Sequence, residues 1–301
     1  MIDFREIEPC DKALFDKYLP DGVERGCEFT FSNLYAWGVQ SFAEVSGCIA
    51  LFSRFGKYSV YLYPIGQGDM RGVVDALISD SAARGVPLVI GGVTLRGVKE
   101  LEELYPGKFR FKYSSSSYDY VYDIDALANL SGRKYHGKRG HIKKFEAAFP
   151  DYKIEEISEN TLPRVKNFVD LWYKKRAEEG TSDYGLEREA ILRALSSFSA
   201  LSLDGIFLTA NDEIVAVTLG SVMNKDTFDV QYEKALWDID GAYPMINRAF
   251  ARYIKQKHPD IRYLDREEDM GIEGLRKAKE SYNPCRRIIK CKAVLRSDEK
   301  I

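Results

Sequence analysis

Residues 227–265 read TFDVQYEKALWDIDGAYPMINRAFARYIKQKHPDIRYLD, and this stretch decides the fold. Apolar and polar residues alternate over Thr227–Glu233, which is typical of a β-strand with two different faces. After Gly241, the apolar residues of segment 242–254 recur at i, i+3, i+4 and i+7, which indicates an amphipathic helix. Ile261–Leu264 then predicts a second strand. Strand, glycine loop, helix and strand in this order are typical of a layered α/β domain.

The segments on both sides extend this unit. Upstream, Gly205–Thr209 and Ile214–Met223 predict a hairpin that leads into the alternating strand. Downstream, we expect a helix over Ile272–Glu280 and a closing strand over Arg287–Leu295. The second half of the chain therefore predicts a sheet with helices packed on it.

The first half repeats the same order of elements. Its expected strands and helices are Ser46–Phe55, Lys57–Tyr63, a helix that follows Gly66-Gln67-Gly68, Val86–Ile90, Leu95–Leu104 and Phe109–Tyr113. This repetition favours an internal duplication over two unrelated α/β domains that share a layered design. We predict an N-terminal domain at 1–128, a basic linker at 129–149 and a C-terminal domain at 150–301.

Composition limits the class of protein. The 301 residues are 45% hydrophobic and 30% charged, with a net charge of −2, which argues against disorder and against a protein that coats nucleic acid. The first residues lack the apolar segment of a signal peptide, and no uninterrupted apolar run is long enough to span a membrane. The five cysteines and three histidines show no metal-ligand spacing, so we predict no metal site.

The predicted linker carries a concentrated positive charge. Within 129–144 there are six cations and no acidic residue, which favours contact with a phosphate-bearing partner. Gly137 and Gly140 make this segment a poor plain helix. Lys138 and Arg139 are our predicted contacts with a polyanion, and the alternative is a solvated connecting helix.

Three motifs point to a known family. The segment from Tyr263 to Pro284, YLDREEDMGIEGLRKAKESYNP, resembles a signature of the phosphatidylglycerol lysyltransferase C-terminal domain family. Glu28–Trp37 (EFTFSNLYAW) and Gly137–Ile142 (GKRGHI) are similar to its N-terminal and central motifs. The resemblance covers nearly the whole chain.

The resemblance implies two tandem GNAT-like (acyl-CoA N-acyltransferase) domains, an α/β (α+β) fold in which mixed central sheets are flanked by helices. It also implies a relation to the Fem-type transferases, which move an amino acid from aminoacyl-tRNA to an amine or hydroxyl. The transmembrane helices that precede this domain in the membrane-anchored lysyltransferases do not occur in this sequence, which leaves a lipid substrate open.

The sequence of the loop before each central helix indicates which acyl donor to expect. Many GNAT enzymes hold the CoA pyrophosphate with a glycine-rich loop before the central helix. In the second half that loop carries Asp238 and Asp240, which would repel a pyrophosphate, and the first half keeps only Gly66-Gln67-Gly68. We therefore expect aminoacyl-tRNA as donor, with a CoA thioester as second choice and no required cofactor.

We expect the catalytic base to be a carboxylate. Transfer from an activated ester needs alignment, a proton acceptor and donors for the developing oxyanion. Glu233 and Asp229 share the polar face of the alternating strand, and either could be the base, unless that face is only solvated. We expect Glu233 to act.

The charged end of the following strand supplies the other candidates. Arg266 can hold a phosphate or carboxylate with two hydrogen bonds, and Tyr282 can give a proton to a leaving hydroxyl. Carboxylates at 267–269 can instead stabilise a helix N-terminus, and the cations of the next helix its last turn. The predicted catalytic residues are Glu233, Arg266, Glu267 and Tyr282, and the predicted substrate contacts are Lys138, Arg139, Asp229, Asp269, Arg276 and Lys279.

Two functions of different classes remain open. The first is an acyl- or aminoacyltransferase that contacts a tRNA acceptor end or anionic lipid headgroups through the basic linker. The second is a non-catalytic GNAT-like module that binds an anionic ligand or partner. The expected location is the cytoplasm, with peripheral attachment to a membrane left open.

Overall fold

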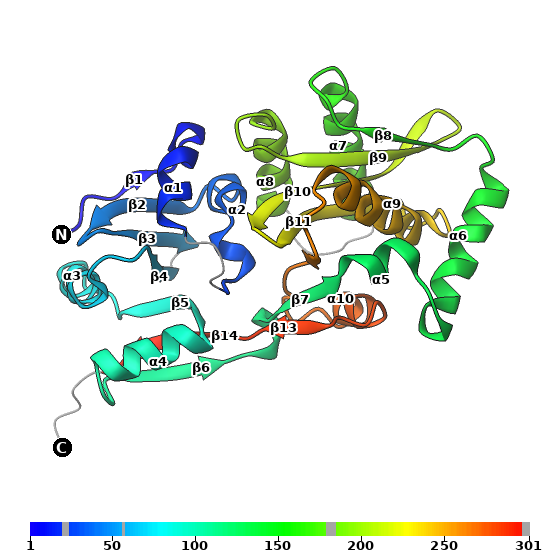
Figure 1. The fold of residues 1–301 in the computed structure, drawn as a ribbon. Helices are drawn as coiled ribbons and strands as arrows, with labels where there is room; N and C mark the ends of the chain where they lie inside the picture. The colour runs from blue at the N-terminus through cyan, green and yellow to red at the C-terminus, as the bar shows by residue number, and fades with distance from the viewer. Residues whose placement is uncertain (20–23, 56–57, 179–184, 297–301) are drawn as a thin grey trace. The chain divides into compact units, whose positions relative to one another are not determined.

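Two compact units make up the chain (Figure 1). The structure, a computed structural model, describes residues 1–19, 24–55, 58–178 and 185–296. Unit 1 comprises Met1–Asp119, Glu268–Glu273 and the chain from Arg287, and unit 2 comprises Tyr120–Glu267 and Gly274–Arg286. Each unit is built on its own seven-stranded sheet.

The first sheet has the order β1-β2-β3-β4-β5-β14-β6. Its strands are β1 (Arg5–Glu6), β2 (Gln40–Val45), β3 (Cys48–Phe55), β4 (Tyr58–Ile65), β5 (Val89–Thr94), β14 (Lys290–Leu295) and β6 (Phe109–Tyr113). The helices of this part are η1 (Pro9–Asp11), α1 (Lys12–Tyr18), η2 (Cys27–Phe29), α2 (Phe31–Ala36), α3 (Met70–Ala83), α4 (Leu95–Leu104) and η3 (Ser115–Ser117). The helix expected after Gly66-Gln67-Gly68 is α3, and its Val73, Val74 and Leu77 lie in the core.

The second sheet has the order β13-β7-β12-β11-β10-β9-β8. Its strands are β13 (Arg286–Ile288), β7 (Asp119–Asp123), β12 (Tyr263–Asp265), β11 (Thr227–Ala235), β10 (Glu213–Asn224), β9 (Asp204–Ala210) and β8 (Lys153–Glu156). The helices here are α5 (Ile124–Asn129), η4 (Arg133–Tyr135), α6 (His136–Ala148), α7 (Leu162–Glu178), α8 (Gly185–Ser196), α9 (Ala242–Lys257) and α10 (Glu273–Glu280).

The two sheets share one design, which confirms the predicted fold class. Each contains a parallel pair that is joined through a helix: β4 and β5 through α3, and β11 and β12 through α9. On one side of the pair lies an antiparallel run of strands, and on the other side lie two more strands. The repeated order of elements in the sequence corresponds to this repeated sheet.

The inner strands next to the parallel pairs are exchanged between the halves of the sequence. β14, from the C-terminal end, lies between β5 and β6 in the first sheet, while β7, from the first half, lies between β12 and β13 in the second. The expectation of one closing strand at Arg287–Leu295 in the second sheet is therefore wrong. Alternation of apolar residues tells which face of a strand is buried, but it does not tell which sheet the strand joins.

Two further expectations differ in detail. Segment 136–148 forms helix α6 in spite of Gly137 and Gly140, because Ile142 and Phe145 anchor it in the core. The strand predicted at Val86–Ile90 is β5, Val89–Thr94, which continues through two glycines; Gly92 adopts φ +67° where the pairing with β14 shifts register. The start of the predicted strand at Lys57 lies outside the described residues.

Candidate functional site

The parallel strands of unit 2 separate at their carboxyl ends. β11 and β12 pair over three residues, the last pair being Asp229 with Asp265. β12 ends there, whereas β11 continues to Ala235, and the Arg266 N–H donates to the carbonyl of Tyr120 instead. Ligands of open α/β sheets bind at the carboxyl ends of parallel strands. The point where these two strands separate is therefore the place to look for a site.

Glu233 and Arg266 form an ion pair at this point. Nη2 of Arg266 donates to Oε1 of Glu233 at 2.8 Å, and the two side chains are 12% and 10% exposed. The other carboxylate oxygen of Glu233 accepts a hydrogen bond of 3.0 Å from Asn247 of α9. Both oxygens of Glu233 are thus engaged, and the carboxylate orients the guanidinium.

Arg266 keeps one donor free. Its Nη1 is buried and has no hydrogen-bond partner in the described part of the chain. Leaving a buried charged donor unsatisfied costs free energy, so such a group is suited to an incoming acceptor atom. A phosphate, carboxylate or carbonyl oxygen would meet that need.

Tyr282 connects Arg266 to helix α6. The guanidinium carbon of Arg266 lies 4.9 Å from the centre of the Tyr282 ring, and Nζ of Lys138 lies 3.8 Å from the same centre. Both are cation–π distances. Burial raises the pKa of the Tyr282 hydroxyl well above its usual value, so the hydroxyl stays protonated. The backbone carbonyl of Tyr282 accepts from Tyr135 at 2.9 Å, which holds the ring's segment in place.

Lys279 supports the same group from α10. Its Nζ donates to the backbone carbonyl of Arg266 at 2.5 Å, and its own carbonyl accepts from the Tyr122 hydroxyl at 2.8 Å. We call this set the Arg266 cluster: Lys138, Glu233, Arg266, Lys279 and Tyr282. It contains three cationic side chains and one carboxylate, so it carries an excess of positive charge.

Two other predicted site residues, Arg139 and Asp229, lie outside the Arg266 cluster. Arg139 donates to the carbonyls of Leu130 and Gly132, and so it closes the end of α5. Asp229 is fully buried inside β11, which contradicts a solvated strand face at that position.

The remaining three belong to the loop after β12 and to α10. Glu267 has φ +58°, and its N–H donates to Asp265 at 2.8 Å. Asp269 is fully buried in unit 1 and accepts from the Gly271 N–H at 2.8 Å. Arg276 is half-buried on α10. Roles for these residues stay predictions.

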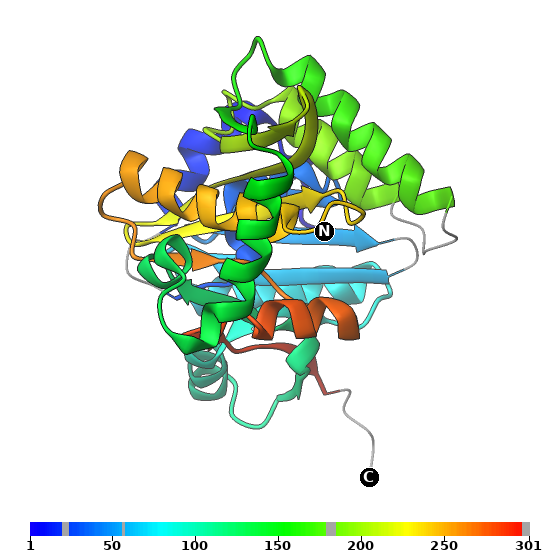
Figure 2. The same cartoon turned by 90° about the vertical axis from the view of Figure 1, so that its right-hand side faces the viewer.

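The loop before α9 is covered by α6, which lies against α9 (Figure 2). Asp240 pairs with Nδ1 of His141 at 2.5 Å and with Lys144 at 3.4 Å, and Asp238 pairs with Lys175. Gly241 has φ +88°, and a Cβ there would lie 2.3 Å from the carbonyl oxygen of His141. The two aspartates are therefore held in pairs with other side chains, and the sequence did not reveal these contacts, that of His141 among them.

The corresponding loop in unit 1 is also covered. The N–H of Asp69, next to α3, donates to the carbonyl of Ser46 at 2.9 Å. A Cβ on Gly68 would lie 2.4 Å from the carbonyl of Gly47. The turn between β2 and β3 thus occupies the N-terminal end of α3.

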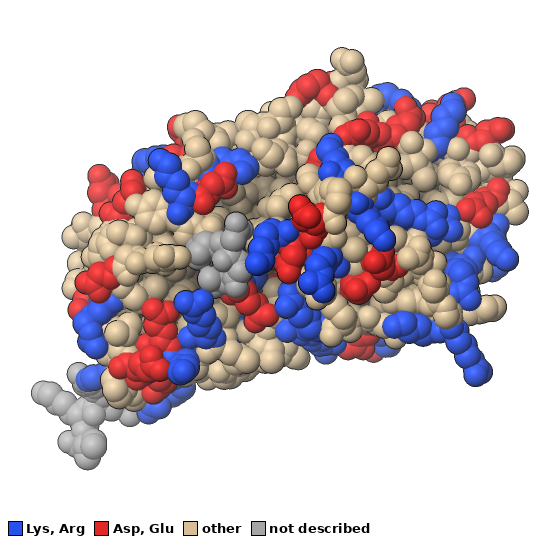
Figure 3. Space-filling model, in the orientation of Figure 1, with Lys and Arg blue, Asp and Glu red and all other residues tan. Residues whose placement is uncertain are grey.

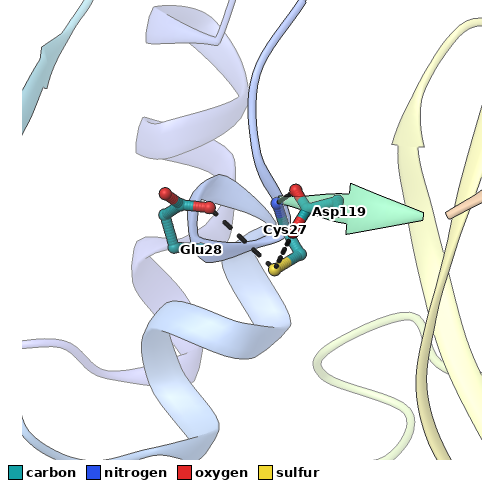
Figure 4. Close-up of side chains that lie close together, drawn as sticks. All are labelled: Cys27, Glu28 and Asp119. Carbon is teal, nitrogen blue, oxygen red and sulfur yellow. Dashed lines mark hydrogen bonds between the residues drawn. The ribbon is translucent and has the colours of Figure 1, made fainter. Parts of the chain in front are cut away.

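A second charged cluster lies in unit 1, and we call it the Lys290 cluster. Nζ of Lys290 lies 2.6 Å from Glu28, 2.8 Å from Asp119 and 3.4 Å from Glu268. Figure 4 shows Glu28 and Asp119 on two sides of the Cys27 thiol, which lies 3.3 Å from Asp119. Burial alone would lower the pKa of Lys290, but the surrounding anionic groups raise it well above its usual value.

The Lys290 cluster brings together residues from two of the sequence motifs. Glu28 comes from the motif Glu28–Trp37 and Glu268 from the motif that begins at Tyr263. The ligand atoms of Cys27, Glu28 and Asp119 lie within 4.8 Å of one another, but the Lys290 ammonium already contacts both carboxylates. Lys290 itself was not predicted, because a lysine in a basic strand gives no sign of burial.

The family model of the phosphatidylglycerol lysyltransferase C-terminal domain matches residues 22–289. The chain belongs to this family. A solved protein of unknown function from Bacteroides thetaiotaomicron is 35% identical to this family member, with a TM-score of 0.91, and covers 98% of this chain and 100% of its own. No curated protein sequence matches the chain.

Two more distant structures share the fold of this lysyltransferase-family chain. The L-PGS structure from Bacillus licheniformis is 16% identical with a TM-score of 0.68, and the alignment covers 99% of this chain and 94% of that one. FemX is 11% identical with a TM-score of 0.63, and 97% of each chain is covered. Family and fold together place the chain among the transferases.

The face of the molecule drawn in Figure 3 carries charges of both signs. In the view of Figure 3, cationic and anionic side chains are interspersed, with cations along the edge where α6 lies. None of the helices in the described ranges has the length and apolar character that crossing a membrane requires.

Proposed function

We propose that this chain is an acyltransferase that moves an aminoacyl group from aminoacyl-tRNA to an amine or hydroxyl acceptor. The family match and the Fem-like fold support a transferase of this type. The single observation that carries the location of the site is the unpartnered Nη1 of Arg266 where β11 and β12 separate. In the reaction this donor would hold a phosphate of the substrate or the oxyanion of the transition state.

The two covered loops favour a donor other than CoA. A pyrophosphate needs exposed N–H groups at a helix N-terminus. The α9 loop is packed under α6, and at α3 the N–H of Asp69 is already used by Ser46. A tRNA acceptor end, which is held through its backbone phosphates, does not depend on these loops.

Exposed cations next to the site suit such a partner. Arg133 and Lys134 of η4 and Lys143 of α6 are exposed, whereas Lys138 and Arg139 are partly buried. The logarithm of the tRNA binding constant should fall linearly with the logarithm of salt concentration. We expect replacement of the three exposed cations by glutamine to make this slope shallower by about two to three. An unchanged slope, measured by filter binding from 50 to 300 mM salt, would exclude this surface as the contact.

The test of the proposed function is transfer of a radiolabelled aminoacyl group from a charged tRNA mixture. The acceptors are phosphatidylglycerol vesicles and a lysine-containing peptide. We expect label in one acceptor, and a loss of about 100-fold with Arg266→Gln, because one oxyanion donor contributes that much. Arg262→Gln, at an exposed position just before β12, is the matched control. Transfer from acetyl-CoA but from no aminoacyl-tRNA would contradict the proposed donor.

One observation favours the second function. Each oxygen of Glu233 already accepts a hydrogen bond, so the base expected from the sequence is engaged with Arg266 and Asn247 in this arrangement. A protein that binds the charged tRNA and transfers nothing to either acceptor would be a binding module.

A further inference from the structure

Lys138 has surroundings unlike those of the other cations on its helix. It lies in the first turn of α6, and its Nζ contacts the Tyr282 ring instead of a carboxylate. Within the described ranges it forms no ion pair. Burial and then the guanidinium of Arg266 lower the pKa of Lys138 to about 8, while Glu233 acts in the opposite sense.

The amine adjoins the other groups of the cluster, because its Nζ and the guanidinium of Arg266 contact the same Tyr282 ring. A Cβ added at Gly137 or at Gly140 would meet nothing within 4 Å, so the helix has open space at these two positions. The same cluster offers the unpartnered Nη1 of Arg266 for an oxygen atom. An amine and an oxygen-binding donor near one another are the two groups that acyl transfer requires.

We propose that Lys138 is the general base of the transfer reaction and that its neutral amine takes the proton of the attacking acceptor. This inference rests on the proposed function. The nitrogen or oxygen of the acceptor bonds to the ester carbonyl carbon while Nζ of Lys138 accepts the proton. The bond between that carbon and the donor's ester oxygen then breaks, and the ammonium of Lys138 returns the proton to this oxygen.

The charge balance of the cluster supports this role. With a pKa of about 8, about a quarter of Lys138 is neutral at pH 7.5, against about one part in a thousand for an ordinary lysine. The fixed charges that face it are Arg266 and Glu233, which pair with each other, and Tyr282 stays protonated. Lys138 is therefore a group of the Arg266 cluster that can exchange a proton near neutral pH.

The first experiment separates a base from a mere cation. Lys138→Arg keeps the positive charge but cannot become neutral, so we expect transfer to fall by about 100-fold or more while tRNA affinity changes less than about twofold. Lys174→Arg, at an exposed position of α7, is the control and keeps full transfer. The wild-type rate should rise with pH and level off above a midpoint near 8. Retained transfer in Lys138→Arg would overturn the proposal.

The second experiment does not depend on activity. Lysines are labelled with a trace of acetic anhydride at pH 6 to 11, and the rate at each site is read by mass spectrometry. We expect half-maximal labelling of Lys138 near pH 8, well below the ordinary lysine value of about 10.4. An ordinary midpoint at Lys138, or no labelling there at pH 9, would overturn the base role.

The two failures can be told apart. If no acceptor receives an aminoacyl group, the proposed function fails and the base role falls with it, whatever the labelling shows. If transfer occurs and Lys138 titrates as an ordinary lysine, the proposed function stands and only the base role is lost.

Discussion

Glu233 and Arg266 are 33 positions apart in the sequence, yet they form one of the most enclosed ion pairs of unit 2. The carboxylate accepts from Arg266 and from Asn247, and the guanidinium also contacts the ring of Tyr282. A carboxylate that accepts hydrogen bonds at both oxygens is better suited to hold its partner in position than to act as a general base. We therefore interpret Glu233 as a positioning residue that aims Arg266.

The first prediction tests this interpretation. In Glu233→Gln the amide can still accept from Arg266 but no longer balances its charge, so we expect transfer to fall about 10- to 100-fold. Because Glu233 raises the pKa of Lys138, we also expect the midpoint of the pH–rate profile to move to lower pH in the variant. The profile is measured under single-turnover conditions in both proteins. Disappearance of a pH-dependent limb in the variant would instead show that Glu233 is the base.

The second prediction concerns the Lys290 cluster. In Lys290→Met three carboxylates lose a cationic partner, and loss of one member of a buried ion pair costs about 3–5 kcal/mol of unfolding free energy. Burial of a carboxylate without its cation raises its pKa, so protonation relieves the loss at low pH. We expect the melting-temperature difference from wild type to grow between pH 4 and pH 7.

A matched control sits on the same strand. Lys292 of β14 is exposed, and Lys292→Met should change the melting temperature little at either pH. A Lys290→Met protein as stable as wild type at pH 7 would show that the cluster contributes no net stability.

Part of the site could be predicted from residues alone. Glu233 and Arg266 were predictable, because a polar strand face and a charged strand end must meet where the parallel pair separates. The burial of Lys138 and Lys290 was not, because a lysine in a basic segment gives the same signal whether its amine faces solvent or a protein ring. The paired states of Asp238 and Asp240 likewise depend on α6, which is far away in the sequence.

Elements with strong periodicity agree with their predicted bounds. The structure has three such elements at the predicted positions: the alternating strand β11, the amphipathic helix α9 and helix α4. Helix α6 does not follow its composition, because tertiary packing of Ile142 and Phe145 outweighs the low helix propensity of its two glycines. Propensity thus predicts an element only where packing does not oppose it.

The third prediction compares Gly241, which precedes α9 and lies against α6, with Gly140 of α6, which has open space beside it. Gly241→Ala puts a Cβ on a residue with φ +88° and 2.3 Å from the His141 carbonyl, so we expect a loss of more than about 1 kcal/mol in unfolding free energy. Gly140→Ala meets nothing within 4 Å and should gain up to about 1 kcal/mol. Both are measured by urea denaturation, and a tolerated Gly241→Ala would mean that the α9 loop can open.

On the scale of the whole molecule, the exchange of β7 and β14 makes each sheet dependent on the other half of the sequence. In both sheets the exchanged strand is an inner one, with a neighbour on each side. Its fully or nearly fully buried side chains, such as Tyr120 in β7 and Ala293 in β14, complete the core. The expected simple tandem order could not reveal this, because strand neighbours are set by long-range pairing.

The fourth prediction follows from this dependence. Segments 1–150 and 151–301, expressed separately, should each lack an inner strand and fail to melt cooperatively, whereas co-expression should give a soluble complex of the two. Circular dichroism and size-exclusion chromatography measure the outcome. A cooperatively melting 1–150 segment would show that its sheet closes without β14.

Exchange of the last strand also sets an order of events during synthesis. The ribosome releases β1 to β6 long before residues 290–295, so the first sheet to be made is the last to be finished. Until β14 has been made, the place between β5 and β6 is vacant, and the edges of these two strands can pair with other nascent chains. We expect this protein to depend on chaperones that hold nascent chains, and a stalled or truncated translation product to be cleared by proteolysis because its first unit has not been completed.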